Sequence, residues 1–435
     1  MSYTSQAAIL KDIKAMLCEP GLLINTSHTV QRIDVNCIDY VYKLLTKSRE
    51  FQKLMSQSKP VKSNDTSVKY RMSGNEMYRN KIYLKALKYY TRSINFAENK
   101  SSYLGLAYAN RSAVLFEKKY YKECLEDIER ALENKYPDHL KQKLLKRQQE
   151  AEHLKKTQKP LHYHHITPRI INKNALIDAA SDALEIQINE KFGRHIVATK
   201  DIKIGDVIAV EKPFAHLLFP KNRWLHCHEC LNLCYNMIPC GECTTALYCS
   251  KECRTKAFTS YHRFECDFVE YFHKHPLLFM KMVVVGLQNS DINSNAADNL
   301  YCSNRFKEIK ALTTNEDKKK DESLLLAAAM ASIGFYCLKS NQNFSLEFDL
   351  ENNESLIKEL LYKCALNENC NGFFVAKYHE HRSKSEHIGE AVYSFISLFN
   401  HSCVPNCDTY FYGSHVVVRA RANIKKGDQC MISYG

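Results

Sequence analysis

A chain of 435 residues with 45% hydrophobic and 25% charged residues has the composition of an ordinary soluble protein with two to four domains. No stretch reaches the roughly 20 apolar residues that a membrane-spanning helix needs, so we expect no membrane partner. Lys and Arg number 61 against 48 Asp and Glu. This moderate surplus suits acidic partners, and because a charge-rich helix face explains part of it, we do not expect nucleic acid to bind.

Residues 1–67 are predicted to form a helical and linker segment, with one helix around residues 38–51. The N-terminal sequence MSYTSQAAILKDIKAML carries charges that interrupt any apolar core of signal-peptide length. We therefore expect an intracellular protein of the cytoplasm and nucleus, in which cysteines stay reduced.

Residues 68–160 are predicted to form paired amphipathic helices of the tetratricopeptide (TPR) type. The characteristic small, aromatic and apolar positions are, in a first copy, Gly74, Ala86, Tyr90 and Ser93, and in a second copy, Cys124, Ile128, Ala131 and Pro137. Two repeats leave one apolar face uncovered. The basic helix after Pro137 is suited to cover it.

A concave groove of such repeats is predicted to bind a peptide. Some TPR domains bind the acidic C-termini of cytosolic heat-shock chaperones with a carboxylate clamp. The residues at similar positions here are Arg71, Asn75, Asn110 and Lys141. Cations and amide N–H donors suit a terminal carboxylate. Leu145 stands where the clamp has a basic residue, although Lys146 and Arg147 follow it. Polar residues on a wetted concave face are the alternative explanation.

Two distant segments alternate apolar and polar residues around a glycine-containing turn. They are FGRHIVATKDIKIGDVIAVEKP, residues 192–213, and VVVRARANIKKGDQCMISYG, residues 416–435. Each is predicted to form a β-hairpin in which Gly205 or Gly427 supplies a positive φ. Together they indicate one β-domain that is split by insertions.

The first insertion is rich in metal-type ligands. They are Cys227, Cys230, Cys240, Cys243, Cys249, Cys253, His262 and Cys266. Their CxxC, CxxC, CxxxC and HxxxC pairs predict two tetrahedral Zn²⁺ ions, which would supply most of the folding free energy of a segment with few large aliphatic residues. Disulfides in a secreted module are the alternative, and the N-terminus argues against them. Cys234 lies off this spacing and is not assigned to a metal.

The second insertion, residues 267–376, is predicted to be helical at 277–287, 324–338 and 350–367. The apolar segment 324–338 contains Ser332 and Gly334, so a buried helix is favoured over a membrane span. The polar loop at 290–322 is expected to be mobile.

The segment SFISLFNHSCVPNC, residues 394–407, is a polar cluster that closes an apolar strand. Its central residues Asn400 and His401 can hydrogen-bond a ligand. Taken alone, such side chains are more often polar groups satisfied within the core.

The order of these motifs resembles the SET-and-MYND-domain family of protein-lysine methyltransferases, the SMYD proteins, on their TPR-bearing branch. The motifs are Gly193-Arg194, IKIGD, the cysteine cluster, NHSCVPN and GD…ISYG, and the resemblance covers residues 68–435. It implies a multidomain α+β fold in which helical TPR repeats precede a β-rich SET domain that is split by a two-zinc MYND finger and a helical insertion. The implied SET and MYND boundaries are 185–226 and 377–435 for the SET domain, with the finger at 227–266.

The resemblance implies a site for S-adenosylmethionine where the NHSC segment and the SYG strand thread through each other. The implied cofactor contacts are Gly193, Arg194, Asn371, Ser397, Leu398, Phe399, Asn400, His401 and Tyr434. Tyr434 is the implied catalytic residue, an orienting hydroxyl that faces the transferred methyl group. The implied zinc sets are Cys227, Cys230, Cys249 and Cys253 on one ion, and Cys240, Cys243, His262 and Cys266 on the other.

Two features depart from the family. His195 stands where many SET domains have a second glycine, and we expect it to crowd the cofactor. The chain ends directly after Tyr434, where the family continues into a post-SET segment that binds a third zinc together with Cys403. On this chain we therefore expect weakened cofactor binding and low turnover. The alternative function is a non-catalytic adaptor or transcriptional co-regulator, in which the TPR groove and a MYND finger that binds proline-containing peptides recruit partners.

Overall fold

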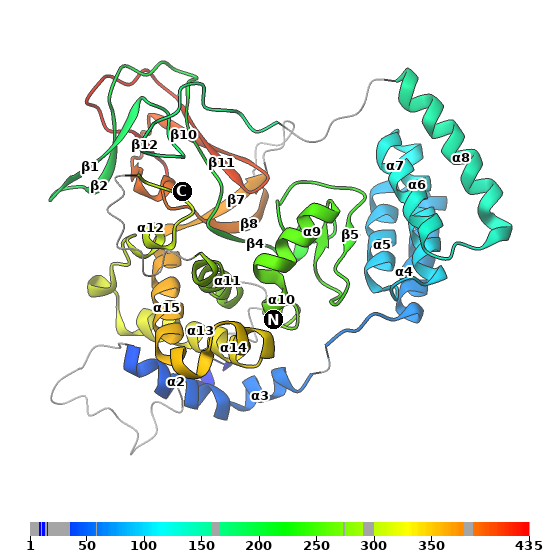
Figure 1. The fold of residues 1–435 in the computed structure, drawn as a ribbon, viewed down its shortest axis with the longest axis horizontal. Coiled ribbons are helices and arrows are strands. Elements are labelled where there is room, and N and C mark those ends of the chain that lie inside the picture. The colour runs from blue at the N-terminus through cyan, green and yellow to red at the C-terminus, as the bar shows by residue number, and fades with distance from the viewer. Residues whose placement is uncertain are drawn as a thin grey trace. The chain divides into compact units, whose positions relative to one another are not determined.

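The computed structural model describes residues 8, 9, 11–13, 15, 35–57, 59–158, 166–272, 275–289, 300–377 and 386–434 (Figure 1). The chain divides into two compact units. The larger unit takes residues 1–58, 166–219 and 260–435, and the smaller unit takes residues 59–165 and 220–259. Each unit therefore joins segments that are far apart in the sequence.

The smaller unit is built on five helices that each pack against the next along the chain. They are α4 (Asn64–Arg79), α5 (Tyr83–Phe96), α6 (Ser102–Glu117), α7 (Tyr121–Glu133) and α8 (Asp138–Thr157). Serine side chains start two of them, because the hydroxyls of Ser63 and Ser101 accept hydrogen bonds from the first turns of α4 and α6. The predicted helical region is confirmed, while its assignment to the TPR family stays a prediction.

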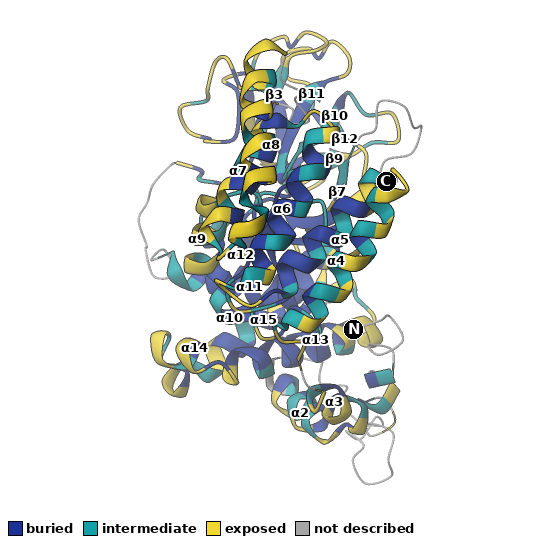
Figure 2. Cartoon of the chain, turned by 90° about the vertical axis from the view of Figure 1, so that its right-hand side faces the viewer, coloured by how far each residue is buried: buried dark blue, intermediate teal, exposed yellow. Residues whose placement is uncertain are grey.

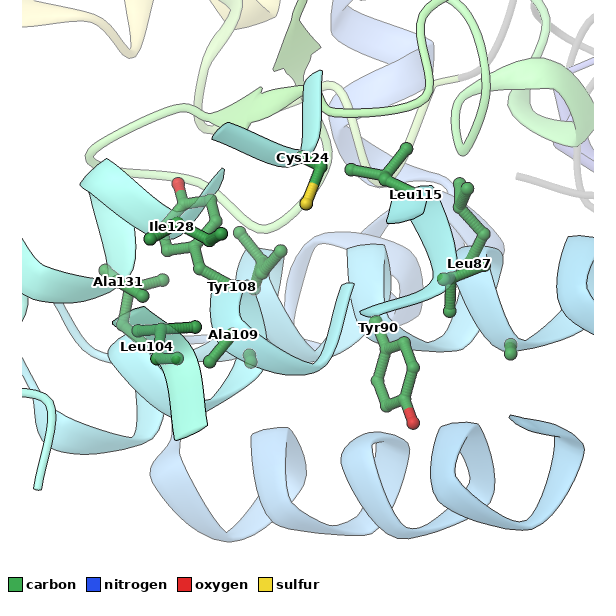
Figure 3. Packing of buried hydrophobic residues seen from close by; sticks show 14 of the residues in the cluster. Leu87, Tyr90, Leu104, Tyr108, Ala109, Leu115, Cys124, Ile128 and Ala131 are labelled. Atoms are coloured by element: carbon green, nitrogen blue, oxygen red, sulfur yellow. The ribbon is translucent and has the colours of Figure 1, made fainter. Parts of the chain in front are cut away.

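The core between these helices uses the small and aromatic positions noted in the sequence. Figure 3 shows Tyr90, Cys124, Ile128 and Ala131 among the side chains that fill it, and all four are buried. A Cβ on Gly74 would lie 2.5 Å from Cε1 of the Tyr90 ring. Glycine at this position therefore lets α4 approach α5 closely.

A buried ion pair links these helices to the cysteine-rich segment. Arg111 on α6 is fully buried, and its Nε and Nη2 donate to the two carboxylate oxygens of Asp127 on α7 at 2.7 and 2.9 Å. The same Nη2 donates to the Met237 carbonyl at 2.9 Å. Arg130 donates to Asp127 at 2.9 Å and to the Asn236 carbonyl at 2.8 Å. Charge-assisted hydrogen bonds thus hold the backbone at residues 236–237 against α6 and α7.

The cysteine-rich part of the smaller unit is short in regular structure. Its elements are β5 (Ile238–Pro239), β6 (Leu247–Tyr248) and α9 (Lys251–Ala257). Two further contacts fix it to α5 and the turn after it: the Asn99 amide donates to the Gly241 carbonyl at 3.0 Å, and the Arg92 guanidinium lies 4.9 Å from the centre of the Trp224 ring. The helices therefore supply packing that this segment lacks by itself.

The larger unit contains most of the strands. They are β1 (Leu184–Asn189), β2 (Gly193–Ala198), β3 (Val207–Glu211), β4 (Ala215–Leu218), β7 (Gly372–Lys377), β8 (Glu386–Val392), β9 (Asn400–His401), β10 (Cys407–Tyr412), β11 (His415–Ala420) and β12 (Met431–Ile432). Their sheets have the orders β1-β2, β10-β11-β3, β4-β8-β7 and β12-β9. Only the β12-β9 pair is parallel among the strand pairs of the described residues.

The prediction of two separate hairpins is wrong. β2 pairs with β1, and β3 pairs with β11, so neither glycine turn joins two mutually paired strands. The two segments instead bond to each other: the Gly205 amide donates to the Ala420 carbonyl and the Gly427 amide to the Ala198 carbonyl, both at 2.8 Å. The alternation of a strand is the same whichever partner it has, so the pattern could not choose between these pairings. Both turns have the expected positive φ, 91° and 88°.

Helices pack around one another in the rest of the larger unit. They are α2 (Val35–Lys47), α3 (Arg49–Met55), α11 (His275–Gln288), α12 (Phe306–Lys310), α13 (Asp321–Lys339), α14 (Gln342–Glu347) and α15 (Leu350–Asn371). The single helix predicted around 38–51 is in fact two, because the Ser48 hydroxyl caps α3 by accepting from the Phe51 amide at 3.2 Å.

Helix α13 is the one described helix whose length and apolar composition would allow it to cross a membrane. However, 67% of that apolar window is buried inside the fold (Figure 2), where α13 packs against α2, α11 and α15. The predicted buried helix at 324–338 is confirmed. Residues 290–299 of the predicted mobile loop lie outside the described residues, and residues 300–322 contain α12 and a 3₁₀ turn at Glu316–Lys318. The loop prediction is therefore wrong for this second part.

We predict that Arg111→Met lowers the free energy of unfolding of the smaller unit by about 3 kcal/mol, because Asp127 loses its bidentate partner while it stays buried. Chemical denaturation followed by circular dichroism measures the loss. The double variant Arg111→Met, Asp127→Leu removes both charges and is expected to recover most of it. A single variant as stable as the original chain would show that the pair is not structurally important.

Candidate functional site

The NHSC segment lies beside the C-terminal strand. In the parallel pair of β9 and β12, Asn400 stands opposite Met431 and His401 opposite Ile432. The pairing continues as the Ser402 amide donates to the Ile432 carbonyl at 2.9 Å. Two segments about thirty residues apart are thereby held in a fixed register.

Asn406 brackets this arrangement, and sequence reasoning assigned it no role. Its amide group donates to the Gln429 carbonyl at 2.9 Å, and its side-chain oxygen accepts from the Met431 amide at 2.8 Å. Asn400 adds a hydrogen bond to the Gln429 side chain at 2.9 Å. The Asn406 side chain thus bonds to one carbonyl and one amide of the opposite strand, as the backbone of a paired strand would. Its place in the NHSCVPN motif is the sequence feature that could have identified it.

Tyr434 is held against the same segment. Its hydroxyl donates to the Phe399 carbonyl at 2.8 Å, its backbone amide donates to His401 Nδ1 at 3.1 Å, and the two rings lie 5.2 Å apart. Burial raises the pKa of the Tyr434 phenol above its ordinary value. The hydroxyl therefore stays protonated at neutral pH, as suits an orienting group.

Arg194 and Asn371 converge on one loop of the second insertion. The Arg194 Nη2 donates to the Ala311 carbonyl at 2.6 Å, and the Asn371 amide donates to the Thr313 carbonyl at 2.9 Å. Strand β2, which carries Arg194, also contacts the 3₁₀ helix Ile396–Leu398 that precedes β9. The structure thus gathers one end of β2, the end of α15 and the segment before Asn400.

The exposure of these residues is uneven. Gly193 is exposed, with open space where a Cβ would stand, and His401 is exposed as well. Phe399 has no exposed surface, and Tyr434 occupies its carbonyl. Direct contact of a ligand with Phe399 therefore requires the Tyr434 hydroxyl to move.

His195 lies inside the β1-β2 hairpin. It is 3% exposed, its Nδ1 lies 2.9 Å from the Gly193 carbonyl oxygen, and its Nε2 lies 3.5 Å from the Asn189 amide nitrogen. The ring therefore packs within the hairpin and stiffens it. Whether it also crowds a cofactor stays a prediction.

Residues 193–435 match the family model of the SET domain, which is more than half of the chain. The chain belongs to the SET domain family. Within it, the relatives are SMYD proteins. Protein-lysine N-methyltransferase SMYD4 of Danio rerio is 32% identical over 226 residues, which is 47% of this chain and 30% of that protein. SMYD4 of Gallus gallus is 24% identical over 88% of this chain and 70% of that protein.

A second SMYD protein is also similar. N-lysine methyltransferase SMYD2 of Homo sapiens is 25% identical over 246 residues, which is 56% of this chain and 52% of that protein. The chain spans less than a third of the length of the Danio rerio relative. The SET domain assignment and the SMYD resemblance predicted from the motifs are confirmed.

Outside the SET domain segments, four cysteines of the smaller unit form one cluster. The sulfur atoms of Cys227, Cys230, Cys249 and Cys253 all lie within 4.8 Å of one another. Cys249 Sγ lies 3.6 Å from Cys230 Sγ and 3.5 Å from Cys253 Sγ. Four thiolates at about 2.3 Å from a tetrahedral zinc lie about 3.8 Å apart, so this donor set fits Zn²⁺. The cluster has the membership that the first predicted ion requires.

The second predicted set is divided between the units. Cys240 and Cys243 belong to the smaller unit, where their sulfurs accept backbone N–H bonds from Glu242 and Ala246 at 3.4 and 3.5 Å. His262 belongs to the larger unit with Cys266, and its Nδ1 lies 3.1 Å from a Glu265 carboxylate oxygen. Such a carboxylate is typical of zinc-ligating histidines. The second ion stays a prediction.

The remaining cysteines give no support to a disulfide module. No disulfide joins two cysteines in the described part of the chain. Cys234 packs in a small apolar cluster with Met237 and Leu247, and burial raises its pKa to about 12. Although Cys249 packs against this apolar cluster, the Cys234 sulfur is not among the grouped ligand atoms, which agrees with leaving Cys234 unassigned.

The predicted TPR clamp residues are only partly brought together. The Asn75 side-chain oxygen accepts from the Asn110 amide at 2.8 Å and from the Tyr90 hydroxyl at 2.9 Å. Lys141 forms an ion pair with Asp138 at 2.5 Å on its own helix. Arg71 acts electrostatically on Tyr90 and so lies in the same neighbourhood.

Arg147, two residues after Leu145, lies against α6. Its Nη1 donates to the Ser112 hydroxyl and to the Ala109 carbonyl, both at 2.9 Å. Arg147 also acts electrostatically on Tyr90, as Arg71 does. The side chain at the expected sequence position, Leu145, is exposed, and the clamp stays a prediction.

We predict that Cys249→Ser removes one equivalent of zinc from the purified chain, measured by a colorimetric chelator after unfolding. Because α6 and α7 hold the segment that carries the cluster, the helical signal is expected to melt at a lower temperature in this variant. Cys234→Ser is the matched control, since it alters a buried cysteine of the same segment and should retain the zinc. Equal zinc contents in both variants would exclude the four-cysteine site.

Proposed function

We propose that this chain is an S-adenosylmethionine-dependent protein-lysine N-methyltransferase. The observation that carries the proposal is the placement of the Tyr434 hydroxyl 2.8 Å from the Phe399 carbonyl, directly beside the β9–β12 pair. Membership of the SET domain family and similarity to proteins named as lysine methyltransferases support it.

The chemistry that the chain must support is modest. S-adenosylmethionine, when bound, supplies an electrophilic methyl group. A lysine amine with a solution pKa of about 10.4 must lose its proton to attack, and an apolar surrounding favours the neutral form. Alignment of the amine with the methyl group then accounts for most of the acceleration.

The Tyr434 hydroxyl provides an oxygen atom for that alignment, and its hydrogen bond to the buried Phe399 carbonyl fixes its position. A hydroxyl oxygen can hold a methyl group by a C–H···O contact worth under about 1 kcal/mol. The raised pKa of Tyr434 keeps the phenol neutral, so it orients rather than removes a proton. In this proposal Gly193, Asn400 and His401 bind the cofactor, and Arg194 and Asn371 fix the loop at residues 311–313 beside it.

The smaller unit is proposed to bind partners. Its cysteine-rich segment is proposed as a MYND finger that holds zinc and binds proline-containing peptides, and its helices as TPR repeats. Residues 59–158 contain 22 Lys and Arg against 12 Asp and Glu, which is most of the positive surplus of the chain. With the Asn75–Asn110 pair and two guanidinium groups nearby, this unit suits an acidic C-terminal peptide, such as that of a heat-shock chaperone.

Calorimetric titration with S-adenosylmethionine is expected to show saturable binding that Asn400→Ala abolishes, because the Asn400 segment forms the proposed pocket. Asn352→Ala is the matched control: that asparagine is on α15, where its amide bonds to Asp349. Flat heats for the original chain, or equal affinity of the Asn400→Ala variant, would remove the enzyme proposal and leave the non-catalytic adaptor.

An acidic peptide with a free C-terminal carboxylate is expected to bind the smaller unit of the full chain, and Asn110→Ala to weaken this binding about tenfold. Fluorescence anisotropy measures the affinity. The same peptide with an amidated C-terminus is the ligand control and should bind poorly, while Tyr434→Phe should bind as the original chain does. An affinity that changes neither when the peptide C-terminus is amidated nor when the salt concentration is raised would contradict a carboxylate clamp.

A further inference from the structure

Glu211 is a buried carboxyl group that the proposed chemistry does not use. It is the last residue of β3 and is 1% exposed. Its Oε1 accepts from the Phe395 amide at 3.0 Å and from the Ser394 hydroxyl at 3.2 Å, and its Oε2 accepts from the Ile396 amide at 2.8 Å. Both oxygens are thus committed to three consecutive residues of one distant segment.

These three residues directly precede the candidate cofactor segment in the chain. Phe395 and Ile396 begin the 3₁₀ helix Ile396–Leu398, and β9 with Asn400 follows directly. The first N–H groups of a helix have no partner within the helix, so an acceptor from elsewhere must satisfy them. Glu211 does this from a strand more than 180 residues earlier in the chain.

The burial of this carboxyl has a cost that its hydrogen bonds offset only in part. Burial raises the pKa of Glu211 to about 8, against the opposing effect of the hydrogen bonds from Phe395 and Ile396, and the nearby Asp178 raises it further. An apolar residue of similar size would avoid this cost. A carboxyl group at this buried place is therefore explained best by its hydrogen bonds, which hold residues 394–396 in position.

Strand β3 is well placed to transmit such a requirement. Glu211 stands opposite Val416 in the β3–β11 pair, which belongs to the rigid three-stranded sheet β10-β11-β3. A side chain that extends from that sheet can fix the position of the turn at residues 394–396 relative to the sheet. The Phe399 carbonyl, which accepts the Tyr434 hydroxyl, lies three residues further along.

We propose that Glu211 is a positioning residue for the cofactor pocket, which sets the position of the segment from Ser394 to Asn400 relative to Tyr434. This inference rests on the proposed methyltransferase function. Glu211 acts through the backbone that it holds and does not touch the reacting groups.

Glu211→Gln is the main test, because it keeps the size of the side chain while it removes the ionisable group and replaces one acceptor oxygen by an NH₂ donor. A glutamine offers one acceptor oxygen and one NH₂ group, so one of the two N–H groups at Phe395 and Ile396 meets a donor. The segment must then shift or lose a hydrogen bond. Asp127→Asn is the matched control, since it alters another buried carboxyl that holds an essential contact in the smaller unit.

Binding of S-adenosylhomocysteine by calorimetry and the melting temperature are measured for the original chain and both variants. Glu211→Gln is expected to raise the Kd at least tenfold, whereas Asp127→Asn lowers the melting temperature but leaves the Kd within about twofold. An unchanged Kd in Glu211→Gln, or losses of affinity that follow the melting temperature in both variants, would overturn the proposal.

Hydrogen–deuterium exchange keeps the test separate from the proposed function. Glu211→Gln is expected to speed exchange at residues 395–400 more than in helix α13 of the same variant. If the original chain binds no S-adenosylhomocysteine, the proposed function fails, and the exchange rates alone test the positioning role. An equal change of the exchange rate at residues 395–400 and in α13 would then overturn the positioning role of Glu211.

Discussion

The parallel pairing of β9 with β12 is the constraint on which the candidate active site depends. Only two residues pair on each strand, so the register relies on the Asn406 side chain, which bonds to the backbone on both sides of residue 430. A slip of one residue would turn each side chain to the opposite face. The contact between the Tyr434 hydroxyl and the Phe399 carbonyl would then be lost, and with it the proposed arrangement around a methyl group.

Buried ionisable side chains play the same part in both units. Arg111 and Asp127 hold the backbone at residues 236–237, and Glu211 holds the backbone at residues 394–396. Each of these backbone segments connects a functional motif to the fold. A buried polar contact costs folding free energy when its partners are removed, so it permits few alternative positions. Directional hydrogen bonds thus specify positions that apolar packing alone would leave variable.

The division of the chain into units separates two kinds of function. Residues 166–219 and 260–435 belong to one unit, while the four-cysteine cluster, which lies within the match to the SET domain model, shares a unit with helices α4 to α8. The proposed methyl transfer depends on the first unit and the proposed peptide binding on the second. Because α6 and α7 hold the cysteine-rich segment, we expect the stability of these helices to depend on the proposed metal binding within the smaller unit.

The sequence by itself determined the features that local chemistry encodes: the CxxC, CxxxC and HxxxC pairs of metal-type ligands, most of the helices, and the motifs of the SET domain, while the grouping of Cys227, Cys230, Cys249 and Cys253 followed from the family resemblance. Only the tertiary structure decided which strands pair across the Gly205 and Gly427 turns, since alternation is the same for any partner. It also placed Arg147 against Ser112, and Glu211 against the segment at 394–396. These choices depend on contacts between residues far apart in the chain, and no local pattern records the partner of a long-range contact.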